Sequence, residues 1–157
     1  MTLPLQKFRE LVFQLLFAHS VQAQDEREIR ELMMRELATT KRNVRDAQLR
    51  VAEIAAKMPV LDRLIREVAT AYELERIQAV ERNCLRLGLY EMLYDDAIPA
   101  KVAITEAMRL VRKFSTAEAA RFVNAVMDAV YQRSLGEGIE CAFEPAAAGA
   151  LVSAVDF

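Results

Sequence analysis

Helical periodicity covers most of this 157-residue sequence, which contains only 4 glycines and 4 prolines. In the clearest run, apolar residues recur three or four positions apart, at Val44, Ala47, Val51, Ile54 and Met58. Apolar residues at that spacing lie on one face of an α-helix, whereas a half-buried strand needs strict alternation. The sequence shows no convincing alternating segment, and it therefore predicts an all-α fold.

Capping signals and prolines divide this periodicity into about seven helices. Asp25 and Ser115 each precede a glutamate by three residues, which is the pattern of a capping box at a helix start. Pro59 and Pro99 suit the first turn of a new helix and disfavour continuation of the previous one. The segment over 74–94 is apolar on two sides, so we expect it to form the central helix. The predicted helices cover about residues 4–19, 25–37, 44–58, 59–68, 74–94, 99–114 and 115–134.

The length of the chain favours one domain, which we expect over residues 1–134, with a mobile tail over 135–157. No run approaches the roughly 18 to 20 uninterrupted apolar residues that span a bilayer. The first ten residues carry charges within their apolar stretch and lack a small-residue cleavage site, unlike a signal peptide. These patterns predict a cytoplasmic protein with no membrane partner.

Residue types needed for catalysis are scarce. His19 is the only histidine, which excludes HExxH zinc helices and paired-histidine sites. No serine lies in a G-x-S-x-G elbow, and no glycine-rich phosphate loop is present. Cys84 and Cys141 lie far apart and outside any C-x-x-C pattern, so we interpret both as free thiols. The sequence predicts a protein that is not an enzyme, with no catalytic residues, metal or cofactor.

Charge alone makes unaided RNA binding a minority hypothesis, because the net charge is −2 and phosphate neutralisation needs clustered cations. Two local clusters each carry an excess of three positive charges, although a solvated helix face is the ordinary explanation of such clusters. One cluster has Lys41, Arg42, Arg45 and Arg50 against Asp46. The other has Lys101, Arg109, Arg112, Lys113 and Arg121 against Glu106 and Glu118.

The order of small, basic and aromatic positions over 98–130 carries a family resemblance. Ile98-Pro99, the segment 102–107 (VAITEA), Lys113-Phe114 and the segment 121–125 (RFVNA) follow one another in a fixed order. They resemble the IP-x-x-VAINEAVELAK-x-FG block of the NusB family and the K/R-FVNGVLD helix that comes after it. The match is strongest over about 76–130. The resemblance implies an all-α bundle of about seven helices, with two three-helix sub-bundles sharing a long central helix.

The resemblance also implies a function. NusB-family proteins are non-catalytic transcription antitermination factors, so it implies binding to boxA-type single-stranded RNA together with NusE, a small-subunit ribosomal protein. The expected outcome is read-through by the RNA polymerase antitermination complex, particularly in ribosomal RNA operons. The implied partner-binding residue is Glu81, and the implied RNA-binding residues are Lys7, Arg9, Phe17, Glu118, Arg121 and Phe122.

This sequence departs from the family pattern at several positions. The arginine-rich start of the first helix is reduced to Lys7 and Arg9, Thr105 replaces an asparagine, and Ser115 and Ala125 replace glycines. Fewer phosphate contacts weaken binding and reduce its dependence on salt. We therefore expect weak unaided RNA binding, in which the aromatic rings stack on unpaired bases and the partner supplies further contacts.

Several alternatives stay open. Phe122 could be core, Glu118 could complete a cap with Ser115, and Glu81 could be solvated. A helical protein-interaction module with weak or no RNA binding is the second functional hypothesis. A phosphotransfer bundle using His19, or a detached form of the NusB-like domain that precedes ribosomal RNA methyltransferases, is the third. The broad apolar first helix leaves monomer and homodimer both open.

Overall fold

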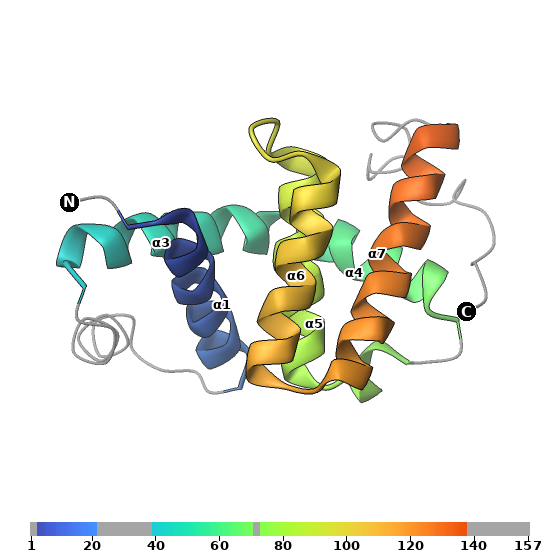
Figure 1. Ribbon diagram of the computed structural model, residues 1–157, viewed down its shortest axis with the longest axis horizontal. Coiled ribbons are helices and arrows are strands. Elements are labelled where there is room, and N and C mark those ends of the chain that lie inside the picture. The colour runs from blue at the N-terminus through green and yellow to red at the C-terminus, as the bar shows by residue number, and fades with distance from the viewer. Residues whose placement is uncertain (1–2, 22–38, 71–72, 138–157) are drawn as a thin grey trace. The chain divides into compact units, whose positions relative to one another are not determined.

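The computed structural model describes residues 3–21, 39–70 and 73–137 (Figure 1). Within these ranges the chain forms six α-helices and one short 3₁₀-helix, η1, with no strand. The predicted all-α class is thereby confirmed. The helix predicted over 25–37, and the predicted tail beyond residue 137, lie outside the described residues. No helix in the described ranges is long and apolar enough to cross a membrane.

The chain divides into two units between Ala56 and Lys57. The first unit contains α1 (Leu5–Val21) and α3 (Lys41–Ala56), which pack against each other. The Thr40 hydroxyl accepts the Asn43 backbone N–H at 3.2 Å and thus caps the start of α3. The predicted inward face of α3 is confirmed at three fully buried positions, namely Val44, Ala47 and Ile54. Buried residues of α1 include Leu11, Val12, Leu15 and Leu16.

The second unit is built around α5 (Ala79–Tyr94). It also contains α4 (Met58–Val68), η1 (Leu74–Arg76), α6 (Ala100–Phe114) and α7 (Ala117–Glu137). Figure 1 shows α6 and α7 side by side with α5 against both, and α5 also contacts α4. Because neighbours cover α5 on several sides, residues around much of its circumference are buried. The two apolar sides predicted for this helix are explained by its central place in the unit.

The helix predicted over 74–94 begins later than its periodicity suggested. Residues 74–76 form η1, Gln78 adopts an extended backbone, and α5 starts at Ala79. The Arg82 guanidinium donates to the carbonyl oxygens of Leu74 at 3.3 Å and Ile77 at 3.2 Å. A side chain thus satisfies carbonyls that a continuous helix would have used for its own backbone bonds. The prediction of one unbroken helix was therefore wrong in its first turn.

The last helix also starts differently from the prediction. Thr116, rather than Ser115, is the N-cap of α7, because its hydroxyl accepts the Ala119 backbone N–H at 3.0 Å. Glu118 lies in the first turn but precedes the position from which a capping-box glutamate reaches back. The predicted capping box of Ser115 and Glu118 was wrong, and this frees the Ser115 hydroxyl for another partner.

Close packing in the second unit depends on the absence of a side chain at Gly88 of α5. A Cβ atom at this position would lie 2.9 Å from Sδ and Cε of Met127 on α7 and 3.0 Å from Cβ of Ala107 on α6. These distances are shorter than ordinary van der Waals contact. The glycine therefore lets α6 and α7 approach α5 more closely than a larger residue would allow.

We expect Gly88→Val to lower the free energy of unfolding by about 2 kcal/mol, because the added atoms overpack the α5–α6–α7 contact. The matched control is Gly136→Val on α7, where an added Cβ would meet no atom within 4 Å. That control should change stability by less than about 0.5 kcal/mol. Urea denaturation followed by circular dichroism measures both values, and equal effects of the two substitutions would contradict this packing argument.

Candidate functional site

An open pocket of about 360 Å³ lies in the second unit. Three parts of the chain form its walls: η1 with the first turn of α5, the α6–α7 junction, and the first two turns of α7. Its lining residues are Arg76, Ile77, Gln78, Glu81, Ser115, Thr116, Glu118, Ala119 and Phe122. The pocket therefore brings together three of the residues that the sequence predicted to bind RNA or a partner.

Glu81 lies in the first turn of α5 and is only 6% exposed. The Ser115 hydroxyl donates a hydrogen bond of 2.6 Å to its carboxylate oxygen Oε1. The other oxygen, Oε2, is buried and has no hydrogen-bond partner among the described residues. The N-terminus of α5 favours the carboxylate charge through the helix dipole. Glu81 is thus not a solvated surface residue, and half of its hydrogen-bonding capacity is unused.

Phe122 and Glu118 lie one turn apart on α7 and both line the pocket. The Phe122 side chain is half-buried, so part of it stays exposed, and Glu118 is exposed. Because Thr116 caps the helix, Glu118 is not required for capping. Arg121 precedes Phe122 and is exposed without lining the pocket.

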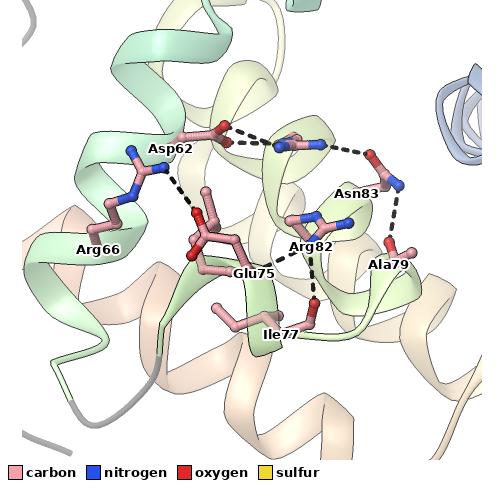
Figure 2. A network of polar contacts seen from close by, with 9 residues as sticks. Asp62, Arg66, Glu75, Ile77, Ala79, Arg82 and Asn83 are labelled. Atoms are coloured by element: carbon pink, nitrogen blue, oxygen red, sulfur yellow. Dashed lines mark hydrogen bonds and ion pairs between the residues drawn. The ribbon is translucent and has the colours of Figure 1, made fainter. Parts of the chain in front are cut away.

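A polar network between α4 and α5 holds the α5 side of the pocket in place (Figure 2). The Arg86 guanidinium donates to both oxygens of Asp62, at 2.8 and 2.9 Å, and to the Asn83 side-chain oxygen at 3.3 Å. Asn83 in turn donates to the carbonyl of Ala79 at 2.9 Å, in the first turn of α5. This chain of bonds joins α4 to the turn that carries Glu81.

Nothing in the sequence pattern indicated the Asp62–Arg86 pair, because its members are 24 residues apart. A second ion pair between α4 and η1 joins Arg66 to Glu75 at 3.6 Å and lies on the surface (Figure 2). The two pairs differ in burial: side-chain exposures are 12% and 14% for Arg86 and Asp62, but 53% and 75% for Arg66 and Glu75.

The remaining RNA-binding residues predicted from the sequence belong to α1, in the first unit. Lys7 is exposed and forms an ion pair with Glu10 at 3.6 Å. Arg9 is only 3% exposed. Phe17 is half-buried, with its ring centroid 6.1 Å from that of Phe13. Of the two basic residues in this arm, Lys7 is therefore the one with an accessible charge.

The basic cluster of α6 and α7 is partly neutralised. Arg109 donates to Glu106 at 3.1 Å, and the Lys113 ammonium lies 5.8 Å from the centroid of the Phe114 ring. The side chains of this cluster that the structure leaves exposed are Lys101, Arg112, Lys113 and Arg121. The accessible positive charge of the second unit is thus smaller than the count from the sequence.

Cys84 lies one turn after Glu81 on α5 and is fully buried as a free thiol. Burial, and secondarily the negative charge of Glu81, raise the pKa of this thiol well above its usual range. A thiol that stays protonated is a poor nucleophile. The interpretation of Cys84 as a free thiol is confirmed, whereas Cys141 lies outside the described residues.

We expect Arg86→Met to lower the free energy of unfolding by about 3 kcal/mol, because it leaves the Asp62 carboxylate partly buried without its partner. Arg66→Met removes the exposed pair instead and should cost less than about 0.5 kcal/mol. Thermal and urea denaturation of the two variants provide the comparison. Similar losses in both would show that burial does not set the contribution of these pairs.

Comparison with known proteins places this geometry in a family. The sequence pattern of the NusB family matches residues 6–132. The transcription antitermination protein NusB of Dehalococcoides mccartyi (strain CBDB1) is 31% identical over 130 residues, covering 83% of this chain and 91% of that protein. The structure of T. maritima NusB is similar, with a TM-score of 0.72, 30% identity, and coverage of 84% of this chain and 93% of that one.

A structure of the antitermination factors NusB and NusE in complex with double-stranded RNA has the same fold, with a TM-score of 0.68. It is 23% identical and covers 81% of this chain and 95% of that chain. The family pattern spans all the residues that line the pocket and the three predicted site residues of α1. The chain therefore belongs to the NusB family.

Proposed function

We propose that this chain is a non-catalytic transcription antitermination factor that binds boxA-type single-stranded RNA together with NusE. The complex would promote read-through by the RNA polymerase antitermination complex, particularly in ribosomal RNA operons. Family membership over residues 6–132 supports this function, since the curated relatives are named transcription antitermination proteins. The structural relative solved with NusE and RNA supports both partners.

One observation carries the proposal beyond the family match. Phe122, assigned to RNA, and Glu81, assigned to NusE, line the same open pocket, together with Glu118. Because a single surface offers an aromatic ring and a buried carboxylate, RNA and the partner protein would bind next to each other. Cooperative binding then follows, because each ligand adds contacts to a surface that the other has already ordered.

Aromatic stacking supplies the affinity that charge does not. The Phe122 side chain is half-exposed, so an unpaired base could stack on it, and the exposed Arg121 beside it could meet a phosphate. Stacking is available to bases in single strands, whereas bases within a duplex cover one another. With a net charge of −2 and one accessible cation in the α1 arm, the protein should bind RNA weakly unless NusE contributes cations.

A second function is favoured by the α1 residues. Lys7 is paired with Glu10 and Arg9 is almost fully buried, so the basic arm offers RNA little charge. A protein-interaction module that binds NusE but contacts RNA weakly or not at all fits this arrangement. The two functions differ in whether RNA strengthens the complex with NusE.

We expect labelled boxA RNA to bind weakly to the protein alone and at least about tenfold more tightly when NusE is present. Fluorescence anisotropy titrations at two salt concentrations, with single-stranded, scrambled and duplex RNA, provide the measurement. Phe122→Leu should weaken RNA binding about tenfold, because it removes a stacking face while keeping an apolar side chain. Tyr131→Leu, two turns further along α7, is the matched control and should have little effect.

The outcomes separate the hypotheses. NusE binding without any RNA enhancement would favour the protein-interaction module. A protein that binds neither NusE nor boxA RNA, alone or together, would remove the antitermination function altogether.

A further inference from the structure

The unpartnered oxygen of Glu81 indicates what the pocket accepts. Glu81 is 94% buried by its 6% exposure, its Oε1 is bonded to Ser115, and its Oε2 has no partner among the described residues. A buried carboxylate oxygen without a donor is unfavourable, and a hydrogen-bond donor that carries positive charge satisfies it best. Since Glu81 lines an open pocket, such a donor could enter from outside the molecule.

The charges around the pocket favour a cation. Glu81 and Glu118 contribute two negative charges, and the N-termini of α5 and α7 together contribute roughly one positive charge. Arg76 also lines the pocket, but it is exposed and paired with Glu73 at 3.3 Å. Arg82 is not a lining residue, and its guanidinium is bonded to the carbonyls before α5. The balance is negative, so the pocket suits a positively charged group rather than a phosphate.

The apolar walls specify the shape of that group further. The Phe122 ring, Ile77 and Ala119 line the pocket beside the carboxylates. Lysine and arginine combine an apolar stem with a cationic head, and the head binds favourably over an aromatic face. A volume of about 360 Å³ is large enough for one such side chain.

We propose that this pocket receives a single lysine or arginine side chain of the protein partner, with Glu81 as its counter-charge and Ser115 as a positioning residue. The inference rests on the proposed function, because it takes NusE as that partner. It adds the kind of side chain that NusE must present, and a role for a serine at which this sequence departs from the family pattern.

Ser115 is suited to this role because its other polar groups are already used. Its backbone N–H donates to Val111 at 2.7 Å and ends α6, while Thr116 caps α7. The hydroxyl is therefore available to Glu81 and holds Oε1 at 2.6 Å. Fixing one oxygen restricts the carboxylate to one orientation before the partner arrives, which reduces the entropy lost on binding.

The first test is Glu81→Gln, which keeps the size of the side chain and removes its charge. Isothermal titration calorimetry with NusE should show at least about 30-fold weaker binding and a smaller dependence on salt. Asp128→Asn is the matched control: it removes one charge from an exposed position of α7 outside the pocket, and should change affinity less than about twofold. Binding of boxA RNA to Glu81→Gln without NusE should equal that of the unmodified protein.

A double-mutant cycle tests Ser115. Ser115→Ala should weaken NusE binding about threefold to tenfold in the unmodified protein and have no effect when Glu81 is already glutamine. Additive effects of the two substitutions would show that Ser115 does not act through Glu81 and would overturn its positioning role.

The partner supplies an independent test that does not depend on the stability of the Glu81 variant. Replacing lysines and arginines of NusE one at a time by glutamine should identify one position whose loss matches that of Glu81→Gln and does not add to it. If no such position exists, or if Glu81→Gln binds NusE as tightly as the unmodified protein, the pocket proposal fails while the proposed function stands. If the unmodified protein fails to bind NusE, the proposed function itself fails.

Discussion

The close approach of α5, α6 and α7 is the constraint on which the second unit depends. Gly88 leaves no side chain where Met127 and Ala107 converge on α5, so the three helices come into direct contact. This contact brings the start of α5 against the α6–α7 junction, where Ser115 reaches Glu81 across 34 positions of sequence. The pocket exists because these two places meet.

Polar interactions then decide what the pocket can do. The buried pair of Asp62 and Arg86 anchors the first turn of α5 to α4 through Asn83, and Arg82 fixes the chain that leads into it. Within that frame, the Glu81 carboxylate is bonded on one side and unbonded on the other. A rigid, partly satisfied charge beside an aromatic ring suits binding rather than catalysis, because recognition of a cation needs orientation and charge but no group that reacts.

Much of the fold could be predicted because helical periodicity and proline chemistry are local. Pro59 correctly separated α3 from α4, and the predicted inward face of α3 was confirmed. The errors arose where a side chain competes with the backbone: Arg82 binds the carbonyls that precede α5, and Thr116 rather than Ser115 caps α7. Neighbouring hydroxyls at 115 and 116 are both good caps by propensity, so only the folded backbone could choose between them.

The sequence alone determined the helical class, the order of most helices and the family, because each depends on residues read in chain order. It also nominated Glu81, Glu118 and Phe122, through resemblance to other proteins. Tertiary structure decided that these three share one pocket, that Arg9 is buried, and that Ser115 binds Glu81. These facts depend on distances between residues far apart in the chain, which periodicity and composition do not encode.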